Sequence, residues 1–257
     1  MNFKHAAIAL SLLLLCGCQQ KDDSAFIIST SYGDMKITLY DDTPNHKKRF
    51  NKLVKEDVYN EVLFHSVQQE GVAEGGNPAS RDVRPNRIIG ENPIRETISA
   101  EISATRFHKR GAIGMRNGAS SEFYIVLGKK TTKEDITQLE RESFFKKGSA
   151  AIEKLFIQHQ DSLSKLENSG DSIALLKFQE ELIAQAKNEI SAKETWHYSD
   201  EQIRAYREDG GLPALDGEDT VFGEVTEGFD VLEKIEHAAT YPDGRPKENI
   251  VFCIRKE

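Results

Sequence analysis

Two kinds of hydrophobic pattern divide the chain into β-rich and helical parts. Residues 35–40 alternate apolar and polar side chains with a period of two, which is typical of a strand with one buried face. A Tyr32-Gly33-Asp34 turn precedes them, so residues 26–30 and 35–40 are predicted to form a hairpin. Further strands are predicted at residues 62–67, 111–115, 123–127, 220–225 and 250–254.

Two short helices are predicted among these strands. Thr43 and Pro44 suit the cap and the first position of a helix, which Phe50, Leu53 and Val54 continue with an apolar stripe. Residues 229–236 have helical apolar spacing. Many strands with two short helices predict a mainly β fold, a closed barrel capped by the helices, because closure leaves no strand edge exposed.

Residues 131–209 differ from the rest of the chain. Charged residues become more frequent, β-branched runs disappear and apolar residues recur at helical spacing, with a stop signal at residues 168–171. Capping-box patterns begin two of the predicted helices: Thr132 with Asp135, and Ser199 with Gln202. The segment is therefore predicted to be a helical hairpin inserted into the barrel. Its mixed charge favours a solvated addition packed on the barrel's flank, and the alternative is a surface for an unknown partner.

Composition removes several classes of function. The chain has 257 residues, 38% hydrophobic, and a net charge of −8, so a packed core is expected and nucleic acid is a poor partner. The seven histidines show no metal-ligand spacing, and the chain has neither a glycine-rich phosphate loop nor a G-x-S-x-G motif. We therefore predict no metal and no cofactor.

The N-terminus has the features of an export signal. Lys4 precedes an apolar run over residues 6–15 that is too short to span a bilayer. The run ends in Leu15-Cys16-Gly17-Cys18, which resembles the lipobox of bacterial lipoproteins. The resemblance implies a signal peptide over residues 1–17, a lipidated Cys18 and a tether over residues 18–25. The alternative is an ordinary cleaved signal in which Cys18 has no role.

The same resemblance implies a location in the cell envelope. The protein would be lipid-anchored to a membrane, on either its periplasmic or its outer-surface face. Residues 21–23, a lysine followed by two acids, resemble a surface-export signal. After cleavage and lipidation only Cys253 remains as a free thiol, and we predict that it is a small buried residue on a strand.

Three motif-bearing segments, in the same order along the chain, resemble one known family. Residues 64–66 (FHS) and 74–77 (EGGN) are similar to F-H-R and Q-G-G-D; residues 111–117 and 121–125 are similar to G-x-x-x-M-A-N and S-Q-F-F-I. Residues 215–225 are similar to L-D-G-x-x-x-V-F-G-x-V. These are the motifs of cyclophilins, which are peptidyl-prolyl cis-trans isomerases.

The resemblance covers residues 26–130 and 210–257 and leaves out the insertion. It implies an eight-stranded barrel with two capping helices and a peptide groove on one outer face. It also implies a set of substrate-binding positions: His65, Glu74, Met115, Asn117, Glu122, Tyr124, Leu215 and Asp219.

One of the family's positions is substituted in a way that affects the chemistry. Ser66 stands where F-H-R has its arginine, and a hydroxyl is neutral and shorter. Loss of one donor to the transition state costs about 2.7–4 kcal/mol. Arg116, where the family usually has alanine, could restore a cation, although strand alternation could equally turn it away. The groove phenylalanine, methionine and aromatic positions hold Gly71, Val72 and Ala214.

Two functions follow from the resemblance. The first is an isomerase that acts on X–Pro bonds of exported proteins, with activity weakened at Ser66. The second is a non-catalytic module on the membrane surface that binds proline-containing peptides or serves as a scaffold.

Overall fold

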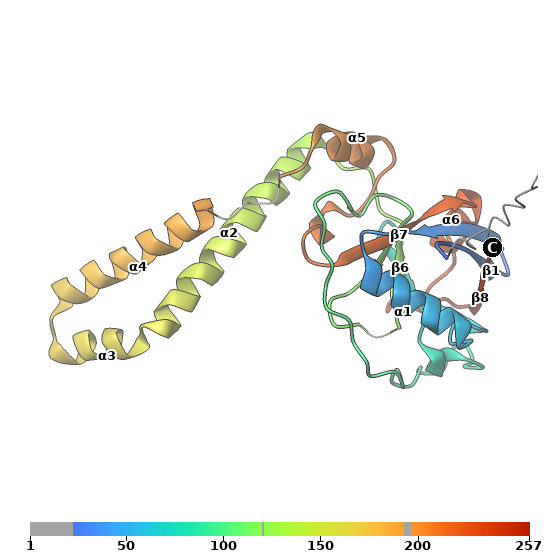
Figure 1. Ribbon diagram of the computed structural model, residues 1–257, viewed down its shortest axis with the longest axis horizontal. Coiled ribbons are helices and arrows are strands. Elements are labelled where there is room, and N and C mark those ends of the chain that lie inside the picture. The colour runs from blue at the N-terminus through green and yellow to red at the C-terminus, as the bar shows by residue number, and fades with distance from the viewer. Residues whose placement is uncertain (1–22, 120, 193–196) are drawn as a thin grey trace, which may run out of the picture.

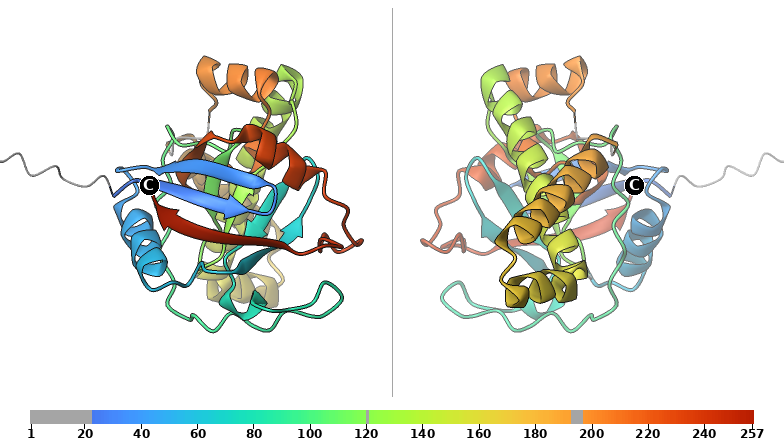
Figure 2. Two further views of the ribbon diagram at one scale, coloured as in Figure 1. Left: turned by 90° about the vertical axis from the view of Figure 1, so that its right-hand side faces the viewer. Right: turned by 90° about the vertical axis from the view of Figure 1, so that its left-hand side faces the viewer.

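The computed structural model describes residues 23–119, 121–192 and 197–257, so the predicted signal peptide and Cys18 lie outside the described residues. Eight antiparallel strands form a closed barrel in the order β1-β2-β7-β5-β6-β4-β3-β8 (Figures 1 and 2). They are β1 Ala25–Thr30, β2 Gly33–Leu39, β3 Val62–Val67, β4 Val72–Gly75, β5 Ala112–Met115, β6 Phe123–Val126, β7 Thr220–Glu227 and β8 Ile250–Lys256. The predicted barrel is confirmed. The sequence missed β4, a strand of four residues that includes a charged residue and a glycine.

Both predicted short helices are present, as α1 Pro44–Lys55 and α6 Phe229–Glu236. Each turns apolar residues into the barrel core, including Phe50 of α1 and Leu232 of α6. Thr43 occupies the cap position of α1 but makes no side-chain cap bond. The predicted cap position is therefore confirmed, although the Thr43 hydroxyl donates to the carbonyl oxygen of Tyr40 at 3.3 Å and not to the helix.

Aromatic side chains fill the centre of the barrel. The ring of Phe50 lies 5.2–5.8 Å, centroid to centroid, from four others: Phe26, Tyr59, Phe123 and Phe222. All five are buried, and several of the pairs are edge-to-face, the arrangement that the ring quadrupoles favour. Phe50 therefore ties α1 to strands from both halves of the chain.

The insertion consists of four helices, α2 Lys133–Gln158, α3 Gln160–Ser169, α4 Ser172–Ala192 and α5 Asp200–Glu208. Both predicted capping boxes are present. The first predicted helix is divided at His159, and α2, α3 and α4 form an arm that projects away from the barrel (Figure 1). Packing along the flank, as predicted, is therefore wrong. Leu155, Leu182 and Ala186 give the arm a small core of its own.

The two ends of the insertion meet beside the barrel. Lys129 and Gly211, on either side of the insertion, pair as an antiparallel bridge. A Cβ on Gly128 would lie 2.5 Å from the Cα of Gly211, so only glycine permits this approach. Because the two ends of the insertion are bridged in this way, the insertion does not interrupt the closed barrel. No helix in the described residues is both long and apolar enough to cross a bilayer.

Truncation of Phe50 should destabilise the whole barrel. Because Phe50 is fully buried among four rings, Phe50→Ala should lower the free energy of unfolding by about 3–5 kcal/mol. Chemical unfolding followed by circular dichroism measures this. Phe145→Ala, whose ring is 69% exposed on α2, is the matched control and should change the free energy by less than about 0.5 kcal/mol. Equal effects of the two substitutions would show that Phe50 does not organise the core.

Candidate functional site

A row of side chains crosses four neighbouring strands on the outer face of the barrel. Ser66 of β3 pairs with Glu74 of β4, and Glu74 pairs with Tyr124 of β6. Tyr124 in turn pairs with Gly114 of β5. Directly paired residues share one face of a sheet, so strand register alone brings these residues together.

The ring of Tyr124 forms the centre of this face. It packs in a second apolar cluster, separate from the barrel interior, with Val72, Ala112 and Val221, and Leu215 lies against the cluster. A Cβ on Gly114 would lie 2.4 Å from the Tyr124 ring, so the absence of a side chain there lets the ring lie on the sheet. Tyr124 and Leu215 are placed together on the outer face, as the resemblance implied.

Met115 does not belong to this face. It packs in the interior cluster and is 2% exposed, and Phe123 lies in the same cluster. Because side chains alternate along β5, an outward Gly114 requires an inward Met115. The predicted substrate-binding role of Met115 is therefore corrected to a core role.

Arg116 supplies a cation to the outer face. Its Nε donates to Glu74 Oε1 at 2.9 Å, and its guanidinium carbon lies 5.6 Å from the centroid of the Tyr124 ring. The Glu74 carboxylate raises the pKa of Arg116, so the guanidinium stays charged. The side chain points over the row and not away from it. Arg81, in contrast, is bonded to backbone carbonyls of residues 57–60.

Carboxylates and a histidine surround this cation. Asp219 Oδ1 accepts a hydrogen bond from the backbone N–H of Asn117 at 3.2 Å. His65 lies next to Ser66, and its buried Nδ1 has no hydrogen-bond partner among the described residues. Burial lowers the pKa of His65, while Glu122 and Glu74 act in the opposite direction. The face is therefore rich in acceptors, with Arg116 as a donor that is already engaged.

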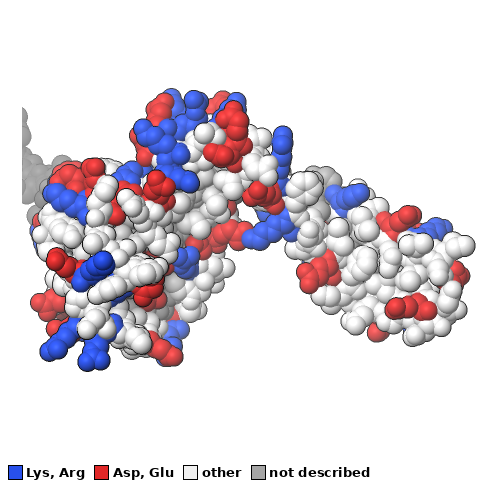
Figure 3. All heavy atoms as spheres, turned by 180° about the vertical axis from the view of Figure 1, so that it is seen from behind, with Lys and Arg blue, Asp and Glu red and all other residues white. Residues whose placement is uncertain are grey.

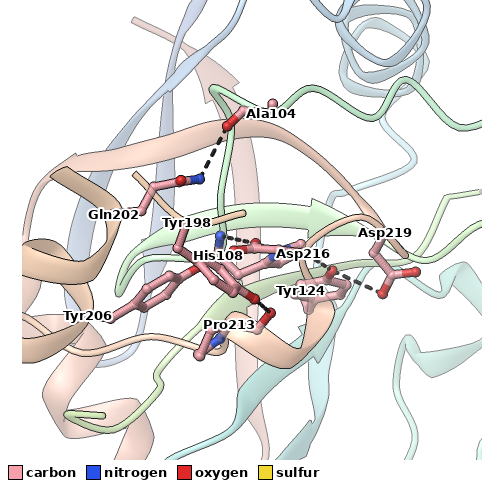
Figure 4. Close-up of polar contacts among 9 residues, drawn as sticks. All are labelled: Ala104, His108, Tyr124, Tyr198, Gln202, Tyr206, Pro213, Asp216 and Asp219. Atoms are coloured by element: carbon pink, nitrogen blue, oxygen red, sulfur yellow. Dashed lines mark hydrogen bonds and ion pairs between the residues drawn. The ribbon is translucent and has the colours of Figure 1, made fainter. Parts of the chain in front are cut away.

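A chain of buried polar groups runs beneath Tyr124 (Figure 4). The Tyr124 hydroxyl lies 2.9 Å from His108 Nε2 and 3.1 Å from Asp219 Oδ2. His108 Nδ1 lies 2.7 Å from Asp216 Oδ1, and the hydroxyl of Tyr206 donates to the other oxygen of Asp216. Tyr206 belongs to α5, so these connected polar groups link the base of the insertion to the outer face.

The hydrogen bonds of this chain limit where its protons can lie. An ionised Asp216 only accepts, so Nδ1 of His108 donates to it. The Tyr124 hydroxyl has one proton, and it can donate either to Nε2 of His108 or to Asp219. Donation to Asp219 would require Nε2 to donate to the phenol oxygen, which needs a doubly protonated His108 because Nδ1 already donates to Asp216. Burial, and the charge of Asp219, raise the pKa of Tyr124, so its hydroxyl remains protonated as a donor.

Sequence patterns did not identify His108, Asp216 or Tyr206. Asp216 lies inside the L-D-G motif, but nothing in the sequence pairs it with residues 108 and 10 positions before it in the chain. No cluster of three or more histidine, cysteine or acidic side chains suited to a metal ion occurs in the described ranges. Cys253 is half-buried on β8 and donates to Asn60 Oδ1 at 3.2 Å, so it is less buried than predicted.

Comparison with known proteins identifies the fold. The family model described as cyclophilin type peptidyl-prolyl cis-trans isomerase/CLD matches residues 25–145 and 206–254, which together are more than half of the chain. A crystal structure of a Cryptosporidium parvum cyclophilin type isomerase, determined in the presence of the dipeptide Ala-Pro, superposes with a TM-score of 0.52 at 17% identity. The match covers 91% of this chain and 98% of that one, and it shows the fold.

Curated relatives give the same result. A Staphylococcus saprophyticus protein assigned by name as a peptidyl-prolyl cis-trans isomerase is 26% identical over 88% of this chain and 87% of its own length. A Staphylococcus aureus protein with the same assignment is 23% identical over 91% of each. A Streptococcus pyogenes protein named as a bifunctional phosphatase and isomerase is 26% identical, and the match spans 37% of its length.

Removal of the Tyr206 hydroxyl should weaken the polar chain. Tyr206→Phe takes a donor from a buried carboxylate, so we expect a loss of about 1.5–3 kcal/mol in the free energy of unfolding. Tyr198→Phe is the matched control, because its hydroxyl donates to the carbonyl of Pro213 at 2.6 Å and should cost about 0.5–1.5 kcal/mol. Only Tyr206→Phe should couple to Tyr124→Phe, by more than about 0.5 kcal/mol in a double-mutant cycle. Additivity of both pairs would contradict a continuous chain.

His65 should make stability depend on pH. Burial lowers its pKa in the folded chain, so the unfolded chain, with an ordinary value of 6.5, takes up a proton first as the pH falls. The stability contributed by a neutral His65 is present above that value and is lost as the pH falls through it towards the folded value. Urea unfolding between neutral and mildly acidic pH should show a smaller loss of stability in His65→Gln than in the wild type. The exposed His237→Gln should behave as the wild type, and a wild-type slope in His65→Gln would contradict the assignment.

Proposed function

The chain belongs to the cyclophilin-type peptidyl-prolyl cis-trans isomerase family, and from that premise we propose that its outer face binds proline-containing segments and accelerates their cis-trans exchange with weakened activity. The proposed face is the row from Ser66 through Glu74 and Tyr124 to Gly114, with Leu215 at one side.

The chemistry requires little covalent machinery. Rotation about a peptide bond costs about 18–20 kcal/mol because the C–N bond is partly double. The two isomers at X–Pro bonds are close in energy, and their exchange is slow enough to limit folding. A catalyst has only to favour the twisted state, in which the prolyl nitrogen becomes a better acceptor. A fixed cationic donor beside an apolar surface provides this.

The position of Arg116 is the observation that carries the proposal. Ser66 cannot place a positive charge on the face, whereas the Arg116 guanidinium lies 5.6 Å from the centroid of the Tyr124 ring. Its partner Glu74 comes from the neighbouring strand, and the ion pair is half-exposed on the arginine side. Tyr124 is 1% exposed and therefore forms the floor of this face, so a proline-containing segment bound above it would lie beside a permanent cation. We propose Arg116 as the donor that takes the role of the family's arginine.

The same ion pair favours the second candidate function. A guanidinium bonded to Glu74 is partly neutralised and less available to a prolyl nitrogen. If the pair does not open, the face binds proline peptides without accelerating their exchange. This describes a non-catalytic peptide-binding or scaffold module.

The place of action follows from the N-terminal motif. We propose that Cys18 carries a lipid and that the barrel acts on exported proteins from the surface of a membrane in the cell envelope. Support comes from the Leu15-Cys16-Gly17-Cys18 motif and the apolar run before it.

Exchange rates measured by NMR on a panel of X–Pro peptides separate the two candidates. If Arg116 is the donor, Arg116→Ala should slow catalysis by about 10²–10³-fold relative to the wild type. Glu74→Gln removes the carboxylate that engages Arg116 and should raise the rate. Arg95→Ala, an exposed arginine paired with Glu91, is the control and should leave the rate unchanged.

Two results would reject the proposed catalysis. If the wild type accelerates no peptide and Ser66→Arg does, the face is an intact binding surface without a catalyst. If Arg116→Ala retains the wild-type rate, another group donates to the prolyl nitrogen.

A further inference from the structure

One helix of this acidic protein carries only positive charge. The sequence of α1, PNHKKRFNKLVK, has five lysines and arginines and no acidic residue, whereas the whole chain has a net charge of −8. Lys48, Lys52 and Lys55 follow the i, i+4, i+7 spacing of one helix face, and all three are exposed. We call these three residues the α1 lysine stripe.

The stripe borders a shallow hollow that is positive overall. Lys256 of β8 and Arg49 of α1 also line this hollow, against two carboxylates, Glu56 and Glu96. Glu96 bonds Arg49 and lies 3.8 Å from Lys52. No carboxylate of the described residues lies within ion-pair distance of Lys48 or Lys55. The side of the molecule turned away from α1 instead mixes both signs of charge (Figure 3).

The stripe lies where the described chain begins. Lys47 pairs with the carboxylate of Asp23 at 2.6 Å, and Asn51 Nδ2 donates to the Asp23 carbonyl at 2.9 Å. Only residues 19–22 separate Asp23 from Cys18. At about 3.3–3.6 Å per residue, a lipidated Cys18 could lie no more than roughly 18 Å from Asp23. A lipid there would hold one side of the barrel near the headgroups. This is the side on which α1 and the C-terminus lie (Figure 2).

We propose that the α1 lysine stripe binds the anionic phospholipid headgroups of the membrane in which Cys18 is anchored. The proposal rests on the lipid anchor of the proposed function. Lysines close to an anionic surface are attracted by its negative potential, by about 1 kcal/mol for each lysine. The stripe would fix which side of the barrel faces the bilayer.

The arrangement leaves the proposed peptide face accessible. In the closed order of eight strands, β6 lies four places from β1, on the opposite side of the barrel. Tyr124 lies on β6, whereas Asp23 leads directly into β1. Attachment beside β1 therefore turns the Tyr124 row away from the membrane.

Vesicle sedimentation tests the stripe without the lipid. The protein is residues 18–257 with Cys18→Ser, which keeps every described residue, and the vesicles are phosphatidylcholine with or without phosphatidylglycerol. We expect salt-sensitive binding only to vesicles with phosphatidylglycerol. Lys48→Glu, Lys52→Glu and Lys55→Glu together should weaken it by about 100-fold.

The control reverses the same number of charges elsewhere. Lys154→Glu, Lys165→Glu and Lys177→Glu lie on the exposed arm and should leave vesicle binding within about twofold, since charges beyond a Debye length of the contact are screened. Equal loss in both triple variants, or binding that does not need phosphatidylglycerol, would overturn the proposal. Circular dichroism verifies that each variant is folded.

Two independent measurements separate this proposal from the proposed function. Fatty-acid labelling of the full chain, compared with that of Cys18→Ser, tests whether Cys18 carries a lipid. The peptide exchange rate tests whether the outer face is catalytic. The lysine variants should retain the wild-type exchange rate in solution, because α1 does not contribute to the Tyr124 row.

Discussion

The buried carboxylate of Asp216 is the constraint that joins the two unusual parts of this barrel. Its side chain is fully buried, and a buried carboxylate is costly unless every oxygen has a partner. The partners come from separate parts of the chain: the backbone N–H and the ring of His108 before β5, and the hydroxyl of Tyr206 on α5. The barrel and the root of the insertion must therefore be ordered together for Asp216 to be satisfied.

The same constraint explains the character of the outer face. Tyr124 stands where cyclophilins have a phenylalanine, and the added hydroxyl has partners only because His108 and Asp219 are beside it. The Tyr124 hydroxyl therefore depends on these polar partners, and His108 in turn bonds the buried Asp216. With Ser66 in place of an arginine, the face is left with several carboxylates and with Arg116 as its cation. A substrate for such a face would have to compete with Glu74 for the guanidinium or bring positive charge of its own.

The sequence predicted the barrel well and the site only in part. Motif order and strand alternation were sufficient for seven strands and both short helices, because these depend on local patterns. Met115 was misplaced because family position was preferred to the alternation that turns it inward beside Gly114. The side of the sheet that Arg116 occupies depends on its contacts with Glu74 and Tyr124, and the pairing of Tyr206 with Asp216 depends on the position of α5; residue spacing encodes neither. The projection of the arm was missed for a related reason: its helices bury Leu155 and Leu182 against each other and do not need the barrel flank.

The insertion is rooted on the side where it can affect the proposed function. Its entry and exit, Lys129 and Gly211, lie next to the strands that carry the Tyr124 row, and Lys146 of α2 reaches Glu218 in the turn that leads to Asp219. A movement of the arm would therefore first displace α5 and this turn. Loss of the Tyr206 bond would leave Asp216 with one partner fewer, so only the backbone N–H and the ring of His108 would hold this carboxylate. Because the Tyr124 hydroxyl shares its one proton between His108 and Asp219, a movement at the arm's root would change the hydrogen bonding of a carboxylate on the peptide face.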